Sequence, residues 1–148
     1  MNNQLFLKLI SAQETIEVRQ PVLRVGRPVK DCIFEGDTAN STLHIGAFYD
    51  NTLVGVVTYM HNPNSIFKGN KQYQLRGMAV LAHFQKKGIG KLLIEKGEHL
   101  LKQKKASLIW CNARVNAVPF YEKNGYCISG NLFDIPTVGP HYMMYKKW

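Results

Sequence analysis

The segment QKKGIGK, residues 85–91, has the composition of a phosphate-binding loop. Glycines leave the backbone open to a ligand, and the first turn of a following helix offers unpaired N–H groups and a partial positive charge. The residues that would supply these groups are Gln85, Lys86, Lys87, Gly88, Ile89, Gly90 and Lys91. An ordinary basic turn that leads into a helix, with its lysines in solvent, explains the same residues equally well.

Two familiar phosphate loops do not match this segment. It lacks the third glycine of the dinucleotide-binding fingerprint, and no Ser or Thr follows Lys91 as a nucleotide P-loop would require. The choice between a phosphate site and a plain turn therefore depends on the elements around it.

The loop lies between a predicted strand, residues 72–80, and the most regular helical pattern of the chain. From Ile89 to Lys102 apolar residues recur at helical spacing, and residues 107–112 then form a short apolar strand. This order predicts two parallel strands joined by a crossover helix.

A second helix is expected after this strand. Asn116 is placed to cap it, Pro119 lies in its first turn, and Gly125 is placed to end it. Two strand-like runs, residues 126–131 and 142–146, follow.

The N-terminal part predicts a strand at residues 5–10 and a helix that begins with the capping-box spacing of Ser11 and Glu14. Pro21 should kink or end this helix, because it lacks an N–H donor. Residues 26–42 are expected to form a long loop or a short irregular helix, and loops of that length are often functional.

Two β-rich runs, residues 44–48 and 53–60, are joined by Asp50-Asn51 and predict an antiparallel hairpin. Together with the other strands they give an α/β (α+β) fold with a mixed sheet of about six or seven strands, flanked by about four helices. We expect a single domain over residues 1–148, because the chain has the usual length of one domain.

The composition narrows the classes of partner. The net charge of +9 favours an anionic partner, but the basic residues are dispersed and not interleaved with aromatics, so we expect no nucleic acid. The 3 cysteines form no CxxC pair and the histidines show no paired ligand spacing, so we expect neither disulfides nor metal. With no signal-peptide pattern and no apolar run of membrane-spanning length, we expect a cytoplasmic protein that does not bind membranes.

Three segments in order resemble motifs of one family. The loop QKKGIG resembles the Gln/Arg-x-x-Gly-x-Gly/Ala pyrophosphate loop of the GNAT superfamily of acyl-CoA-dependent N-acyltransferases. The preceding RGMAV and the later NARVNAVPFYEKNGY are similar to its fourth strand and its last helical segment. The segments RQPVLRVGRP, FEGD and NLFDIPTVGPHYMMYKKW are similar to a bacterial subgroup of small, mostly uncharacterised members.

The resemblance implies a GNAT-like sheet and acetyl-CoA as co-substrate. It implies that the backbone of Met78, Ala79 and Val80 pairs with the pantetheine arm as an added strand would, and that the loop 85–91 binds the pyrophosphate. Asn112 and Asn116 fall where the family often contacts the cofactor, although a plain helix cap accounts equally well for Asn116.

The resemblance also implies a general acid. Tyr121 occupies the position from which family members often protonate the departing thiolate. A phenol, with a pKa near 10, stays protonated where a thiol with a pKa of about 8.5 begins to ionise, so it can donate to the sulfur. A tyrosine that only packs on the sheet would explain the same residue.

The usual base is absent. Many family members carry a glutamate two residues before the position of Met78, where this chain has Arg76, which instead suits an anionic group of the substrate. The residues left as candidate bases or substrate contacts are Glu35, Asp37, His44 and His141, each of which is also explained as a structural side chain.

The expected function is acetyl transfer from acetyl-CoA to a primary amine, by direct transfer within a ternary complex and without an acyl-enzyme. The replacement of the glutamate by Arg76 keeps an alternative open, a GNAT-fold module that binds acyl-CoA as a sensor without chemistry. The acceptor amine is not identified by the sequence, and the protein is expected to be a monomer or a homodimer.

Overall fold

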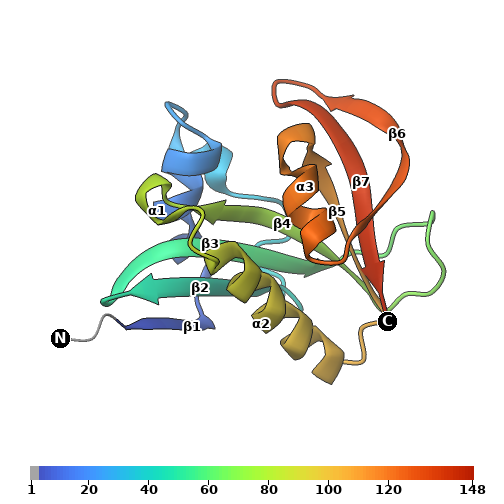
Figure 1. Ribbon diagram of the computed structural model, residues 1–148, viewed down its shortest axis with the longest axis horizontal. Helices are drawn as coiled ribbons and strands as arrows, with labels where there is room; N and C mark the ends of the chain where they lie inside the picture. The colour runs from blue at the N-terminus through green and yellow to red at the C-terminus, as the bar shows by residue number, and fades with distance from the viewer. Residues whose placement is uncertain (1–3) are drawn as a thin grey trace.

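The computed structural model describes residues 4–148, which form one seven-stranded sheet with helices on both faces (Figure 1). The strands are β1 Leu5–Leu9, β2 Leu43–Tyr49, β3 Thr52–His61, β4 Gln72–Val80, β5 Leu108–Arg114, β6 Cys127–Ile135 and β7 Gly139–Lys147. The α-helices are α1 Ala12–Leu23, α2 Ile89–Gln103 and α3 Val118–Lys123, and the 3-10 helices are η1 Val29–Cys32, η2 Ala82–Phe84 and η3 Val115–Ala117. The mixed α/β sheet is confirmed, with three α-helices in the described residues where about four helices were expected.

The strand order is β1-β2-β3-β4-β5-β7-β6, and only β4 and β5 run parallel. These two strands pair over three residues, Gln72 to Gln74 against Leu108 to Trp110, and then separate. The sheet is therefore split toward the C-terminal ends of β4 and β5, where Figure 1 shows the two halves diverging. The parallel pair with its crossover helix α2 is as predicted.

Local signals set most of the helix and turn boundaries. The capping box of α1 is present: Ser11 Oγ accepts from the N–H of Glu14 at 3.1 Å, and the Ser11 N–H donates to Glu14 Oε1 at 2.9 Å. The β2–β3 turn holds Asp50 and Asn51 at φ 49° and 67°, as a tight hairpin requires. Pro21 does not end α1, which continues to Leu23; the proline is exposed and lies in the last turn.

The start of α3 corrects one prediction. Asn116 is not its cap, because the residue lies within η3, and Ala117 is the N-cap without any capping side chain. The chain turns through η3 before α3 begins, so the first helical residue is Val118 and not a neighbour of Asn116. Gly125 ends α3 as expected: at φ +92° it lets the Tyr126 N–H reach the Tyr121 carbonyl at 3.0 Å.

The core forms on both faces of the sheet because strand residues alternate between them. On one face, Val57 and Tyr59 of β3 lie in a large apolar cluster with Leu93 of α2 and Tyr121 of α3. On the opposite face, Val56 packs with Val18 of α1 in a smaller cluster. Helix α3 therefore lies beside the split on one face of the sheet, and α1 lies beside it on the other face.

No helix within residues 4–148 is both long enough and apolar enough to cross a membrane.

Candidate functional site

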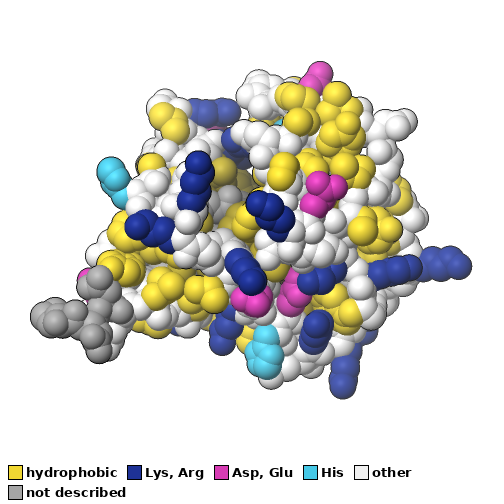
Figure 2. All heavy atoms as spheres, viewed as in Figure 1, with side chains coloured by type: hydrophobic (Ala, Val, Ile, Leu, Met, Phe, Trp, Pro, Cys, Tyr) yellow, Lys and Arg dark blue, Asp and Glu magenta, His cyan; other side chains and the backbone are white. Residues whose placement is uncertain are grey.

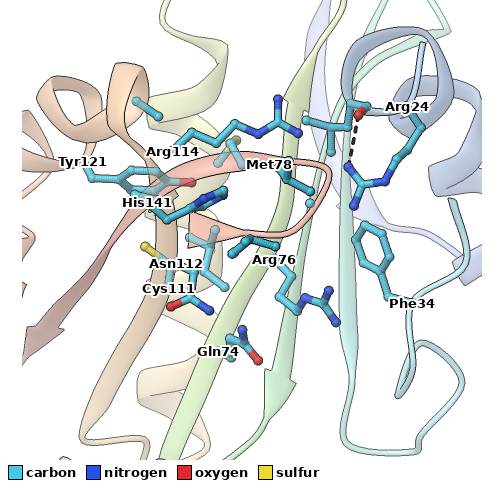
Figure 3. A pocket seen from close by; sticks show the side chains of 17 residues that line it. Arg24, Phe34, Gln74, Arg76, Met78, Cys111, Asn112, Arg114, Tyr121 and His141 are labelled. Carbon is cyan, nitrogen blue, oxygen red and sulfur yellow. Dashed lines mark hydrogen bonds between the residues drawn. The ribbon is translucent and has the colours of Figure 1, made fainter. Parts of the chain in front are cut away.

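A cleft of about 300 Å³ occupies the split between β4 and β5. Figure 2 shows that the surface is hollowed between the two halves of the molecule, and Figure 3 shows the side chains that line the cleft. Its polar and aromatic lining residues are Arg24, Phe34, Gln74, Arg76, Asn112, Arg114, Tyr121 and His141. The side chains come from α1, the loop after it, β4, β5, α3 and β7, so the fold brings together segments that are far apart in sequence.

One wall of the cleft is β4. Beyond Gln74 this strand has no partner on the β5 side, so the edge of Met78, Ala79 and Val80 toward the cleft is not covered by a strand. A bulge at the middle of β4 places two residues, Gly77 and Met78, opposite one residue of β3. Gly77 adopts φ +63°, which favours glycine, and this bend turns the strand at the cleft.

The loop between β4 and α2 has a special backbone. Lys86 and Gly88 have φ of +62° and +82°, and Gly88 is the N-cap of α2. A Cβ at Gly88 would meet no atom within 4 Å, so the space beside this backbone is open. The Gln85 side chain donates to the Val80 carbonyl at 2.8 Å and ties the loop to the end of β4, rather than pointing free into solvent.

Gly90 has a different role from Gly88. A Cβ at Gly90 would lie 2.9 Å from Cζ of Phe120, so the first turn of α2 packs directly against α3. Ile89, the residue before it, is buried in the core, while Lys86, Lys87 and Lys91 are exposed. The loop that was predicted to bind phosphate is therefore in direct packing contact with the helix that carries Tyr121.

Tyr121 is 6% exposed and lines the cleft. Its ring packs edge-on against Phe120 and Tyr126, with centroids 5.1 and 5.6 Å away. Burial, followed by the proximity of Cys111 and Tyr59, raises the pKa of Tyr121 well above its ordinary value. The phenol therefore keeps its proton at neutral pH and can act as a proton donor there.

Cys111 lies on β5 in the same cleft, and burial raises the pKa of its thiol to about 12. A thiol with that pKa is not a thiolate at neutral pH and is a poor nucleophile.

The two candidate asparagines differ in their surroundings. Asn112 lines the cleft, and its Oδ1 is buried without a hydrogen-bond partner among the described residues. A buried acceptor of this kind costs free energy unless a ligand or water donates to it. Asn116 is exposed in η3 and is not among the residues that line the cleft.

His141 of β7 is 3% exposed and lines the cleft. Its Nδ1 lies 2.7 Å from the Gly139 carbonyl. Because a carbonyl only accepts, Nδ1 carries the hydrogen, and the lone pair of the neutral ring is on Nε2.

His44 and Glu35, the other two candidate substrate contacts, do not line the cleft. His44 is buried, with Nδ1 2.8 Å from Thr58 Oγ1 and Nε2 2.8 Å from the Asp37 carbonyl, and Glu35 is exposed. These contacts tie β2 to β3 and to the loop after α1.

Asp37, which was also a candidate base, is committed to an ion pair. Both its carboxylate oxygens accept from the fully buried Arg19, at 2.7 and 3.0 Å. Burial acts to raise the pKa of Asp37, but the hydrogen bonds from Arg19 and from the Phe34 N–H outweigh it and hold the pKa below its ordinary value. The pair anchors the loop that carries Phe34 beside the cleft.

Sequence reasoning selected Arg76 but missed Arg24, Phe34 and Arg114. Arg76 and Arg24 lie over the Phe34 ring, at 4.5 and 5.5 Å from its centroid. Arg114 follows Asn112 at the two-residue spacing of one strand face, which was an available signal. Arg24 and Phe34 lie in segments without periodicity, so only the fold reveals them.

Over residues 4–148 no group of His, Cys, Asp and Glu side chains is arranged to hold a metal ion. On the face that Figure 2 shows, lysine and arginine side chains are scattered rather than gathered into one stripe.

Comparison with known proteins places the chain in a family. Residues 10–126 match the model of the acetyltransferase (GNAT) family. The chain is 35% identical to the uncharacterized N-acetyltransferase YitI of Bacillus subtilis (strain 168), over 95% of this chain and 94% of the relative.

Two solved structures with coenzyme A share the fold. One is an aminoglycoside 6'-N-acetyltransferase, with a TM-score of 0.74 and 15% identity over 96% of each chain. The other is the PaiA N-acetyltransferase of Thermoplasma acidophilum, with a TM-score of 0.69 and 20% identity over 98% of this chain and 99% of the other. The chain therefore belongs to the GNAT acetyltransferase family and is an acyl-CoA-dependent N-acyltransferase that uses acetyl-CoA.

Proposed function

We propose that the protein transfers the acetyl group of acetyl-CoA directly to a primary amine within a ternary complex, with Tyr121 as the general acid. The observation that carries this proposal is the place of Tyr121, a buried phenol of raised pKa in the cleft where the sheet is split.

The residues of this chain fit coenzyme A. The uncovered edge of Met78, Ala79 and Val80 suits a pantetheine arm that pairs as an added strand. The open backbone at Gly88, at the start of α2, suits the pyrophosphate. The unpaired Oδ1 of Asn112 lacks a donor that an amide N–H or the acceptor amine would supply. Asn116, Lys86, Lys87 and Lys91 are exposed, and we assign them at most a peripheral contact.

Acetyl-CoA supplies an activated thioester whose sulfur gains negative charge as the amine attacks. The phenol of Tyr121 donates its proton to that sulfur, and its low exposure keeps water from competing. Direct transfer is supported by Cys111, the thiol in the cleft, because its pKa of about 12 makes it a poor acceptor of the acetyl group.

The amine must lose a proton to attack, and we assign that role to His141. Its Nδ1 is fixed by the Gly139 carbonyl, which leaves the lone pair of Nε2 for the amine or for a bridging water. Gln74 and Asn112 line the same cleft and can orient the amine through hydrogen bonds.

Initial-rate kinetics with acetyl-CoA and a panel of amines test the proposal. Direct transfer predicts intersecting double-reciprocal lines, and no acetylated protein by intact-mass measurement after incubation with acetyl-CoA alone. Parallel lines with an acetylated Cys111 would overturn direct transfer. Saturable binding of acetyl-CoA without product from any amine would favour a sensor module instead.

A further inference from the structure

Three arginines face the cleft without an ion-pair partner among residues 4–148. Arg24 comes from the end of α1, Arg76 from β4 and Arg114 from the end of β5. The ion pairs of the described chain are Arg19 with Asp37, Arg27 with Asp31 and Lys146 with Glu98, and none involves these three. Figure 3 shows Arg114 extending across the cleft toward the side that holds Arg24, and Arg76 directed toward Phe34.

This concentration of positive charge is unfavourable without an anion. Burial, and next the charge of Arg114, lower the pKa of Arg24 below its ordinary value. Burial, and next the charge of Arg19, lower that of Arg76. Arginines remain charged in proteins, so the lowered pKa values indicate an electrostatic cost that a bound anion would reduce.

The nearby carboxylates do not meet this need. Asp37 favours the charge of Arg76 but is already held by two hydrogen bonds from Arg19. Glu35 favours it more weakly, and its exposed side chain does not line the cleft. Within residues 4–148, the only polar contact of the three guanidinium groups is that of Arg24 Nη1, which donates to the carbonyl of the preceding residue, Leu23, at 3.0 Å.

Phe34 fixes the geometry of two of these arginines. It is 8% exposed, and its ring lies against both Arg24 and Arg76. A guanidinium that lies over a ring still has N–H groups at its edge that can donate to a planar anion. Phe34 thus holds Arg24 and Arg76 in place, and all three arginines line the cleft that also contains Tyr121 and His141.

We infer that the acceptor amine carries an anionic group, a carboxylate or a phosphate, which binds between Arg24, Arg76 and Arg114. This inference rests on the proposed acetyl transfer to an amine. Arginine is the side chain best suited to carboxylate and phosphate, because it donates two parallel hydrogen bonds to either group. The same charge repels acceptors with a second ammonium group, so diamines and other polycations are poor substrates.

Matched amines test the inference with the full-length protein and acetyl-CoA. Amino acids and ω-amino acids of increasing chain length are compared with their amides and with the corresponding diamines. Phosphoethanolamine is compared with ethanolamine, which separates phosphate from carboxylate as the preferred anion. We expect kcat/KM for the better anionic series to exceed that of its neutral counterparts by about tenfold or more, and diamines to be the poorest.

Substitution of the arginines makes the test specific. Arg76→Gln and Arg114→Gln should each lower kcat/KM for anionic amines about tenfold relative to kcat/KM for neutral amines, which should be nearly unchanged. Lys30→Gln is the matched control, because this exposed lysine of η1 carries the same charge but does not line the cleft. Equal turnover of neutral and anionic amines, or an equal loss for all amines in the arginine variants, would overturn the inference.

A binding measurement separates failure of the inference from failure of the proposed reaction. If no amine is acetylated although coenzyme A binds, the proposed reaction has failed. N-acetyl amino acids and N-acetyl phosphoethanolamine are then titrated calorimetrically into the protein saturated with coenzyme A. Saturable binding that Arg76→Gln and Arg114→Gln abolish would support the anion site, and absence of such binding to the unaltered protein would refute it.

Discussion

The ring of Phe120 lies against the backbone of Gly90, so close that a Cβ there would be 2.9 Å from Cζ of the ring. Gly90 belongs to the first turn of α2, and Phe120 directly precedes Tyr121 in α3. This contact joins the loop proposed for the pyrophosphate to the residue proposed as the acid. Gly90 is therefore required for the packing of two helices, whereas sequence reasoning assigned its missing side chain to the approach of a ligand.

Replacing Gly90 should disturb both ends of this contact. Gly90→Val forces the Phe120 ring aside, which displaces Tyr121, so we expect kcat to fall and the Kd for coenzyme A to rise together, each by about tenfold or more. Initial rates and calorimetric titration of coenzyme A measure the two effects. The double variant Gly90→Val/Phe120→Ala should recover part of both losses, because the obstructing ring is removed. If the losses of Gly90→Val and Phe120→Ala simply add in the double variant, the contact between the two residues is not the cause of the loss in Gly90→Val.

The loop itself is tested at Gly88 and Lys86. Gly88→Ala meets no atom within 4 Å but must adopt φ +82°, so it should raise the Kd for coenzyme A through backbone strain of about 1–2 kcal/mol. Lys86→Gly removes a charge, but glycine adopts the φ of +62° at this position without strain. We therefore expect the Kd for coenzyme A to change less than in Gly88→Ala. Calorimetric titration of coenzyme A compares them. A larger loss in Lys86→Gly would show that lysine charge outweighs the backbone.

Tyr121→Phe should lower kcat by about a hundredfold or more and leave the Kd for coenzyme A within a few fold, because only the proton donor is removed. Tyr126→Phe is the matched control. Its ring packs against Tyr121 and its buried hydroxyl has no partner among the described residues, but it does not line the cleft. Stopped assays of thiol release measure both variants. An equal loss in the two would assign Tyr121 a role in packing alone.

The pH dependence of the reaction follows from the raised pKa of Tyr121. The acid acts in its protonated form, and a pKa above the ordinary value near 10 keeps it protonated to higher pH. We therefore expect kcat to show no alkaline loss from this group up to about pH 10, within the range in which the fold persists. An alkaline limb near pH 9 that disappears in Tyr121→Phe would contradict the raised pKa.

Much of the fold could be predicted because its signals are local. The Ser11–Glu14 capping box, the Asp50-Asn51 turn and the left-handed Gly125 each act within a few residues, and each was confirmed. The prediction for Asn116 failed because a 3-10 turn competes with a helix start over the same residues, and sequence alone does not rank the two.

The cleft could be predicted only in part. Arg76 was identified as a contact for an anion because it replaces an expected acid within a motif. Its counterparts Arg24 and Arg114 come from other segments, and they meet it only because β4 and β5 separate after three paired residues. That separation is a tertiary feature with no local sequence signal. His44 was selected for its residue type, but the fold uses its two ring nitrogens for structural contacts, one to Thr58 of β3 and one to the Asp37 carbonyl in the loop after α1.

The Arg19–Asp37 pair predicts how stability depends on pH. The pair is bidentate, with side chains 0% and 4% exposed, so Asp37→Asn leaves a buried charge uncompensated and should lower the free energy of unfolding by about 3 kcal/mol near neutral pH. Because the folded-state pKa of Asp37 is lowered, its contribution is complete above the unfolded pKa of about 3.9 and is lost as the pH falls through the folded value.

The free energies of unfolding of the unaltered protein and of Asp37→Asn, measured with urea, should therefore differ by a constant amount above about pH 5. The difference should shrink below about pH 4. Asp31→Asn is the matched control, because Asp31 pairs with Arg27 at 3.0 Å on the surface, where such a pair contributes about 0–1 kcal/mol. A difference for Asp37→Asn that persists unchanged to about pH 2 would show that its charge is not the source of the stability. An effect as small as that of Asp31→Asn would mean that other contacts hold the loop that carries Phe34. The positions of Arg24 and Arg76 against Phe34 would then not depend on the Arg19–Asp37 pair.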